Sequence, residues 1–279
     1  MSPDDQLRGI IRSRKAAGRT LLAAISSQKE SYSEIQLAKS WILAISQEST
    51  IIPYGWYQPP PMGMTVLIGN PSQYTRLDYS SLRYSENFPG DHIFSTESVL
   101  YPYFSAVDKS TLMIGDHVGS YYRGHNKEIR EWISYVYRST KKIARSVEIG
   151  MKYSDLFGIC NSILFETGAK NNNYSMQSGL ASDIGHSIPF FGESSYSMDW
   201  MDRSPAEVSK TISTARKFVG PSNNDIIESP CAFTIEPQFI VNGLPMVSFH
   251  MIVVVIDNDI KIIEEFEDLF AHFKMNDWI

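Results

Sequence analysis

Gly185-His186-Ser187-Ile188-Pro189 opens the stretch of sequence that decides the fold, residues 182–256. Fifty positions after this histidine comes Phe233-Thr234-Ile235-Glu236-Pro237, in which a glutamate precedes a proline. A strand-like run, residues 246–256, follows with His250 in its first half. Two imidazoles and one carboxylate on separate elements form a set that suits divalent transition metals or general acid–base chemistry. We therefore expect these three side chains to converge on one site.

Each of the three residues also has a structural interpretation. His186 is consistent with a hydrogen-bonded structural histidine, and Glu236 with a carboxylate at a strand end. His250 lies between Phe249 and Met251, so strand alternation turns it away from two apolar neighbours. The run after it is apolar on both faces, which is typical of a covered sheet. A covered histidine needs a hydrogen-bond partner, and a backbone carbonyl would serve.

These segments resemble the second half of the pita-bread fold shared by methionine aminopeptidase, proline dipeptidase and creatinase. In that family a Gly-His turn supplies a metal-binding histidine, a Thr-Ile-Glu-Pro-like segment a glutamate, and a closing Val-rich strand a further glutamate. The matching positions are His186, Glu236 and His250, and the last departs from the pattern. The resemblance implies an α+β fold with a curved antiparallel sheet covered by helices. It also implies one domain, residues 1–279, in which residues 192–226 are an insertion.

The resemblance implies two further ligands, because the family carries an aspartate on a strand after a Pro-Gly-Asp turn and another eleven positions later. Here Glu97 and Asp108 follow Pro89-Gly90-Asp91 and stand eleven apart, which requires a one-residue bulge. An ungapped alignment instead places Thr96 and Val107 there, which would leave no ligands. A one-residue shift turns a side chain to the other face. The sequence leaves both alignments open, beside the interpretation that the two carboxylates are solvated.

Apolar residues at helical spacing predict four long helices and an acidic tail helix. Ser31 with Glu34 three positions on is a capping-box pattern at the start of the second helix. The predicted helices cover residues 4–27, 31–47, 126–147, 153–166 and 264–273. Strands are predicted over residues 64–68, 92–103, 104–114, 232–240 and 246–256, and Asn242-Gly243 is a hairpin turn between the last two. Two helices at the start agree with the resembled family.

The composition is globular and acidic, with 279 residues, 43% hydrophobic, 20% charged and a net charge of −6. This charge argues against a nucleic-acid surface. No apolar run approaches the ~20 residues that span a bilayer, so we expect no membrane partner. The first residues lack the basic and apolar regions of a secretory signal. Cys160 and Cys231 therefore fit reduced thiols of a cytoplasmic protein, while a single disulfide between them stays open because sequence separation does not fix spatial distance.

The function expected from the residues and the resemblance is that of a metal-dependent hydrolase for a small amino-acid- or peptide-like substrate. His186, Glu236, His250, Asp108 and Glu97 are the expected ligands of Mn, Fe, Co or Zn, and His186 and Glu236 are also the expected catalytic residues. Because imidazole bridges two metals poorly, His250 favours a single ion. The family's second histidine, which contacts substrate, corresponds here to Glu193 or Ser194, which argues against ordinary peptide cleavage.

Three alternatives remain open at this stage. One is a metal-free C–N hydrolase like creatinase, although no histidine lies between residues 51 and 89, where that enzyme carries its base. Another is a mononuclear non-haem iron enzyme, since two histidines and one carboxylate form its facial ligand set. The third is a binding protein that kept the fold and lost the chemistry. Dimerisation is common in the resembled family, so a homodimer is a further possibility.

Overall fold

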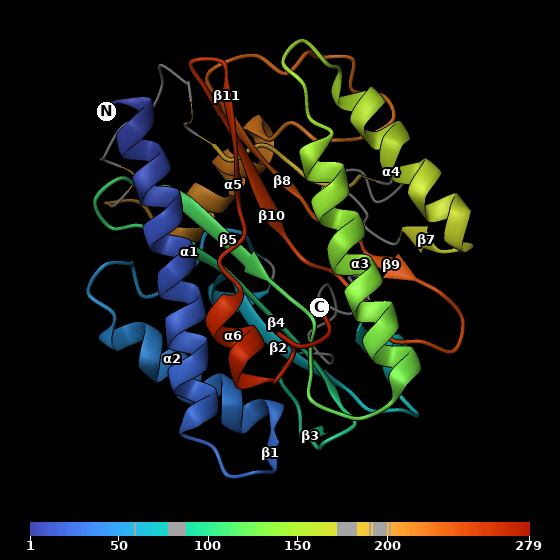
Figure 1. The fold of residues 1–279 in the computed structure, drawn as a ribbon. Coiled ribbons are helices and arrows are strands. Elements are labelled where there is room, and N and C mark those ends of the chain that lie inside the picture. The colour runs from blue at the N-terminus through green and yellow to red at the C-terminus, as the bar shows by residue number, and fades with distance from the viewer. Residues whose placement is uncertain (59, 78–87, 172–182, 190, 192–199, 201) are drawn as a thin grey trace.

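The computed structural model describes the chain outside residues 59, 78–87, 172–182, 190, 192–199 and 201 (Figure 1). Glu193, Ser194 and part of the expected insertion 192–226 therefore lie outside the described residues. That residues 1–279 form a single domain stays a prediction. In the part of the chain that is described, no helix is both long enough and apolar enough to cross a membrane.

The N-terminal half is a helix pair and an antiparallel sheet. The helices are α1 (Pro3–Ser26) and α2 (Glu34–Gln47). The sheet has the order β2-β4-β5, with β6 also paired to β4. Its strands are β2 (Met64–Gly69), β4 (Val99–Val107), β5 (Ile114–Val118) and β6 (Tyr121–Tyr122). Smaller elements are β1 (Tyr32–Ser33), which pairs with β3 (Ile93–Phe94), and the 3-10 turns η1 (Pro61–Gly63) and η2 (Tyr74–Leu77).

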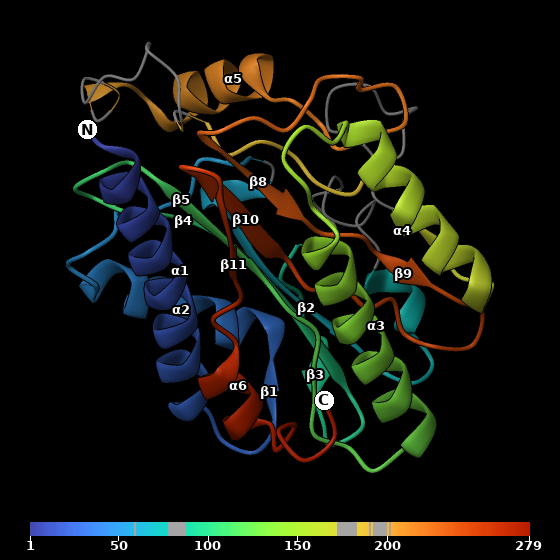
Figure 2. The ribbon, with the colours of Figure 1, turned by 45° about the horizontal axis from the view of Figure 1, so that its top comes forward.

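The C-terminal half has the same kinds of element. Its antiparallel sheet has the order β11-β10-β8, and β7 pairs with β9 beside it. The strands are β7 (Lys170–Asn171), β8 (Cys231–Ile235), β9 (Phe239–Ile240), β10 (Met251–Ile256) and β11 (Asp259–Ile263). The helices are α3 (Lys127–Arg145), α4 (Tyr153–Thr167), α5 (Pro205–Ala215) and α6 (Glu267–His272). Figure 2 shows α5 at the opposite end of the molecule from α6.

The two sheets join at the segment that leads into β10. The His250 N–H donates to the Val118 carbonyl at 3.1 Å, and Ser120 and Ser248 exchange hydrogen bonds beside it. Helices α1 and α2 pack against the N-terminal sheet, and α3 packs against β8 and β10 (Figure 1). The expected α+β fold, a curved antiparallel sheet covered by helices, is confirmed.

Most helices form where the apolar spacing predicts them, but the start of α2 corrects the sequence interpretation. Ser33, not Ser31, caps this helix, and Gln36 completes the capping box. Glu34 is instead fully buried, where it binds the Arg76 guanidinium and accepts a hydrogen bond from the Ile68 N–H. The contacts of Glu34 with Arg76 and Ile68 therefore accompany an N-cap at Ser33 instead of Ser31.

The strands of residues 92–114 also differ from the prediction, which divided them at Pro102. Residues 99–107 form one continuous strand, with Pro102 opposite Val66 of β2. On its other side, β4 pairs with β6 through residues 99–100 and with β5 through residues 103–107. Pro102 lies in the gap between these two ladders, where its missing N–H breaks no regular pair. The proline therefore does not end the strand.

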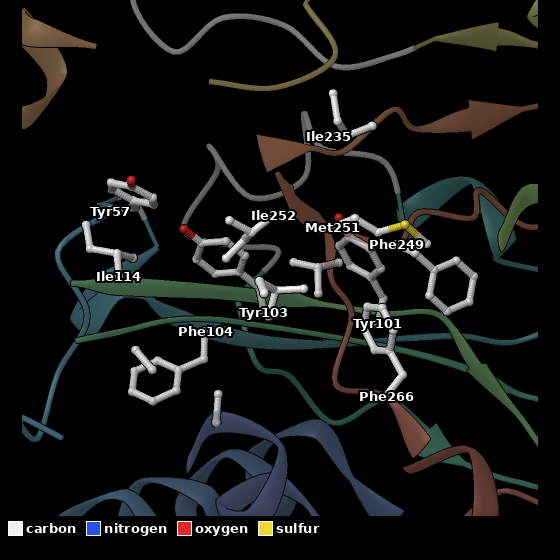
Figure 3. Close-up of a cluster of buried hydrophobic side chains, with 14 of the residues drawn as sticks. Tyr57, Tyr101, Tyr103, Phe104, Ile114, Ile235, Phe249, Met251, Ile252 and Phe266 are labelled. Atoms are coloured by element: carbon white, nitrogen blue, oxygen red, sulfur yellow. The ribbon is translucent and has the colours of Figure 1, made fainter. Parts of the chain in front are cut away.

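Side chains alternate along β4 and so divide the core into two layers. Phe104 points toward the helices, where its ring lies 5.8 Å from that of Trp41 in α2. Tyr101 and Tyr103 project to the opposite face, toward β10, as Figure 3 shows. Ser105 continues this second face because it stands two residues after Tyr103. The second face, covered by the C-terminal sheet, is where the polar side chains gather.

Candidate functional site

Four buried side chains from four segments meet between the two sheets. His250 Nδ1 lies 2.9 Å from Asp116 Oδ2 and 3.1 Å from Glu236 Oε2. His186 Nε2 lies 3.7 Å from Glu236 Oε1 and 3.9 Å from Asp116 Oδ2. We call these four residues the His/carboxylate cluster. The structure thus brings together His186, Glu236 and His250, as expected from the sequence, and adds Asp116.

The small residue before His186 allows its segment to lie against β8. The His186 N–H donates to Thr234 Oγ1 at 2.9 Å, and the Thr234 N–H donates to the His186 carbonyl at 2.8 Å. A Cβ on Gly185 would overlap the Thr234 carbonyl oxygen. The Glu236 N–H donates to the Ile184 carbonyl at 2.7 Å. This main-chain pairing places the histidine and the glutamate side by side although fifty positions separate them.

The tautomer of His186 follows from its neighbour. Nδ1 lies 3.1 Å from the Ser187 carbonyl oxygen, which can only accept, so Nδ1 carries the proton. Nε2 then presents its lone pair to the two carboxylates. Burial lowers the pKa of His186, and the charge of Arg216 lowers it further against the opposing effect of Glu236 and Asp116. His186 is therefore neutral at neutral pH, the form that binds metal.

Arg14 of α1 binds the main chain of both Asp116 and His250. The fully buried guanidinium donates to the main-chain carbonyls of both residues and, at 2.8 Å, to that of Glu264. Gly115 permits this approach, because a Cβ there would overlap the main chain at Arg14. Burial lowers the pKa of Arg14 to about 10, so it stays protonated at neutral pH. Although burial alone would raise the pKa of Asp116, the charge and hydrogen bond of His250 hold it below its usual range.

Two expected ligands lie elsewhere, which corrects the sequence interpretation. Asp108 accepts two hydrogen bonds of 2.9 Å from Arg12 and further ones from Ser110 and Thr111 in the turn between β4 and β5. Glu97 accepts hydrogen bonds from the Tyr122 hydroxyl and, at 3.0 Å, from the His125 N–H. Each carboxylate therefore binds partners of its own, Asp108 the Arg12 side chain of α1 and Glu97 the Tyr122 hydroxyl, and lies outside the cluster.

The ungapped alternative, Thr96 and Val107, is not at the cluster either. Thr96 is exposed, and Val107 is packed in the core. The two residues that stand eleven apart and face each other across β4 and β5 are Ser105 and Asp116. The eleven-residue spacing of the family's two aspartates therefore does occur here, but its first position is a serine, so the pair could not be recognised from the sequence. Asp116 is therefore the residue that sequence reasoning missed.

Ser105 has a structural task at the position where the resemblance leads one to expect an aspartate. Its hydroxyl accepts a hydrogen bond from the Tyr57 N–H at 3.1 Å and donates to the Gly63 carbonyl at 3.2 Å. These bonds fasten the proline-rich loop to the sheet. The Tyr57 ring then meets the His186 ring edge-on, with the ring centres 4.9 Å apart.

The chemistry of the donors fits a divalent ion. One ligand atom from each of Asp116, Glu236 and His250 lies within 4.8 Å of the others. Asp116 Oδ1 is buried and has no hydrogen-bond partner among the described residues, so an acceptor remains available. These two carboxylates and one imidazole, with the His186 imidazole beside them at 3.7 Å from Glu236 Oε1, offer a mixed nitrogen and oxygen set that suits Mn, Fe, Co or Zn. The residues present therefore fit the metal that the resemblance implies.

Comparison with known proteins identifies the fold. No family model and no curated protein match the chain. Among solved structures, it is similar to an X-Pro aminopeptidase from Thermotoga maritima MSB8, with a TM-score of 0.63 and 14% identity over 93% of this chain and 61% of that one. For a prolidase from Pyrococcus furiosus the TM-score is 0.62 and the identity 14%, over 93% of this chain and 63% of that one. For a variant of Escherichia coli aminopeptidase P the TM-score is 0.59 and the identity 10%, over 98% of this chain and 59% of that one.

These likenesses confirm the resemblance in fold. The chain has the pita-bread fold of prolidases and X-Pro aminopeptidases, and it is divergent in sequence. It spans about 60% of the length of these three structures.

Proposed function

We propose that this protein is a metal-dependent hydrolase that acts on a small amino-acid- or peptide-like substrate. The observation that carries the proposal is the His/carboxylate cluster, in which Asp116, His186, Glu236 and His250 meet in a buried space. The likeness in fold to a prolidase and an X-Pro aminopeptidase supports a substrate of this size and class.

The residues of the cluster would divide the work in a definite way. A bound divalent ion lowers the pKa of a water ligand and polarises a carbonyl group. His186 offers Nε2 because Ser187 holds Nδ1, and Arg14 keeps the main chain of Asp116 and His250 in place. Glu236 Oε1, 3.7 Å from His186 Nε2, can hold a proton released during hydrolysis. Burial strengthens each of these electrostatic effects.

The ligand set favours one ion instead of two. Carboxylates bridge pairs of metals, whereas an imidazole nitrogen binds a single metal ion. At the two positions where the resembled family supplies further carboxylates, this chain has Ser105 and His250. The Ser105 hydroxyl is engaged with Tyr57 and Gly63. We therefore expect a mononuclear centre of Mn, Fe, Co or Zn.

Metal analysis tests the proposal. Protein dialysed against EDTA is reloaded separately with Mn, Co, Zn and Fe(II), and its bound metal and its hydrolysis of dipeptides are measured. We expect about one ion per chain for at least one metal, as the three convergent ligands Asp116, Glu236 and His250, with His186 beside them, would provide. His186→Ala should weaken metal binding by about tenfold to a hundredfold. His125→Ala is the matched control, because His125 is exposed and lies outside the cluster.

Other results would favour the alternatives. Absence of metal binding, together with no activation by any of the four metals, would reject the proposal. Turnover of guanidino or N-methyl amino acids by the metal-free protein would favour a creatinase-like C–N hydrolase. Oxygen consumption with Fe(II) alone would favour a non-haem iron enzyme. Unchanged ligand binding in His186→Ala without any turnover would favour a binding protein.

We further propose that the protein works in the cytoplasm on a small-molecule or short-peptide substrate. The free thiols of Cys160, which is buried, and Cys231, which is half-buried, support a reducing compartment. Cell fractionation tests this location. That the chain forms a homodimer stays a prediction, which light scattering of the purified protein would check.

A further inference from the structure

A buried phenol, that of Tyr57, lies against the His/carboxylate cluster. Its ring meets the ring of His186 edge-on, with the ring centres 4.9 Å apart. Arg216 Cζ lies over the same ring, 4.1 Å from its centre. Figure 3 shows the Tyr57 ring on the same face of the N-terminal sheet as Tyr103. These two contacts, together with the bond from the Tyr57 N–H to the Ser105 hydroxyl, fix the position of the ring.

The Tyr57 hydroxyl is a buried donor that the fold does not use. It has no hydrogen-bond partner among the residues that the structure describes, and the residue is only 4% exposed. A buried hydroxyl without a partner lowers stability, so it calls for an explanation, and a catalytic role is one. Burial raises the pKa of Tyr57 against the opposing charge of Arg216, and the charges of Asp116 and Glu236 raise it as well. The hydroxyl is therefore protonated, and so a donor, at neutral pH.

The cluster itself presents negative charge and lone pairs to a substrate. Asp116 and Glu236 are carboxylates, and neutral His186 directs its one N–H to the Ser187 carbonyl. When water adds to a carbonyl group, the carbonyl oxygen becomes negatively charged, and enzymes stabilise this oxyanion with hydrogen-bond donors that are already in place. The unused phenol beside His186 is a donor of this kind.

We propose that Tyr57 is a catalytic residue, whose hydroxyl donates a hydrogen bond to the carbonyl oxygen of the scissile amide as negative charge develops there. This inference rests on the proposed hydrolase function. The water oxygen forms a bond to the carbonyl carbon, the π electrons pass to the carbonyl oxygen, and the water proton passes to Glu236. The C–N bond then breaks, its electron pair and that proton go to the nitrogen, and the C=O bond forms again. Tyr57 keeps its own proton throughout.

Tyr57→Phe removes the hydroxyl and keeps the ring against His186 and Arg216. With the metal-loaded protein and the dipeptide that wild type hydrolyses fastest, kcat should fall by about a hundredfold while KM changes little. Because the hydroxyl is unsatisfied in the free protein, the variant should melt at the wild-type temperature or a few degrees above it. The amount of bound metal should not change. Lost activity without lost stability or metal distinguishes a catalytic donor from a structural one.

Binding of a small oxyanion gives a readout that needs no turnover. Phenylboronic acid forms a tetrahedral boronate with negatively charged oxygens, benzamide is a planar amide of similar size, and neither carries a carboxylate. In calorimetric titrations, Tyr57→Phe should bind phenylboronic acid about tenfold more weakly than wild type does and should bind benzamide equally.

Tyr32→Phe is the matched control. The Tyr32 hydroxyl is also buried without a hydrogen-bond partner in the described part of the chain. Its ring, however, stacks on Phe94 with the ring centres 5.0 Å apart, in the ladder of β1 and β3. This variant should therefore behave as wild type in both assays.

The outcomes separate this inference from the function on which it rests. A kcat and a boronate affinity within about twofold of wild type in Tyr57→Phe would overturn the donor role and leave the hydrolase in place. An equal loss in Tyr32→Phe, or a loss of bound metal in Tyr57→Phe, would also overturn it. If wild type neither binds metal nor hydrolyses a dipeptide, the hydrolase is rejected. Boronate binding that still depends on Tyr57 would then keep this residue as an oxyanion-binding group, and any other boronate result would reject both.

Discussion

Arg14 offers the sharpest test of how the fold holds the site, because one side chain reaches both sheets. Its guanidinium donates to the carbonyls of Asp116 on β5 and His250 before β10, and to that of Glu264. Arg14→Met keeps the length and the apolar stem of the side chain but removes every donor. The substitution would leave the two cluster carbonyls buried without these hydrogen bonds.

The size of the effect follows from opposing contributions. Two buried carbonyls without donors cost about 2–6 kcal/mol. Removing a buried cation relieves part of its desolvation, which offsets some of this loss. We therefore expect the free energy of unfolding to fall by about 3 kcal/mol, a large share of the 5–15 kcal/mol typical of native proteins. Because Asp116 and His250 lose a common anchor, metal affinity should fall by about tenfold or more.

Urea denaturation of wild type and variant, each without metal, measures the first effect, and metal titration measures the second. Lys15→Met is the matched control, since Lys15 is the next residue on α1, its side chain is 52% exposed, and its ion pair with Glu265 spans 3.6 Å. The control should change the unfolding free energy by no more than about 0.5 kcal/mol. A loss below about 1 kcal/mol in Arg14→Met, or unchanged metal affinity, would show that Arg14 does not hold the two strands together.

Three further substitutions test separate parts of the structure. Asp108→Asn should lower the free energy of unfolding at pH 7 and make that free energy less dependent on pH in the acid range. Although burial raises the pKa of Asp108, hydrogen bonds from Arg12, Thr111 and Ser110 hold this pKa below its unfolded value of about 3.9. The ionised carboxylate therefore stabilises the fold above that pH, and this contribution is lost as the pH falls through the folded pKa. Unfolding in urea at pH 7, 5 and 3 measures this, and equal pH slopes in both proteins would contradict it. Gly185→Ala should destabilise the fold by about 2 kcal/mol or more and weaken metal binding, because its Cβ would overlap the Thr234 carbonyl; a melting temperature and a metal affinity equal to wild type would disprove the close approach. Ser105→Ala should cost about 1–3 kcal/mol in urea unfolding, since the buried Tyr57 N–H loses its acceptor, whereas a neutral result would mean that the loop is held by other contacts.

The residues recognised from sequence share one property, which is a short local signature. His186 follows a glycine that must lie against Thr234, and Glu236 precedes a proline at the end of β8. His250 enters a run that is apolar on both faces and forms the buried strand β10. The periodic apolar positions of α1, α3 and α4 likewise predicted these helices closely. In each case the pattern and its cause lie within a few residues of each other.

Asp116 required the pairing of two strands, which no local pattern specifies. Its place opposite Ser105 depends on the register of β4 with β5. Asp108 and Glu97 are carboxylates that could bind a metal, but they form hydrogen bonds with Arg12 and Tyr122, which lie elsewhere in the chain. The sequence alone does not distinguish a metal-binding carboxylate from one that forms an ion pair, because this depends on the groups that surround it in the folded structure.

By itself, then, the sequence determined most of the helices, because dihedral preferences and apolar periodicity act over short distances. Its short segments around His186, Glu236 and His250 indicated three of the four members of the His/carboxylate cluster, and their resemblance to a known family implied the class of fold. Only the tertiary structure decided that Asp116 completes the cluster, that Arg14 anchors it and that Arg216 stacks on Tyr57 beside it. These relations join residues about seventy to more than two hundred positions apart. Such contacts depend on strand register and on the packing of one half of the molecule against the other, neither of which any single segment encodes.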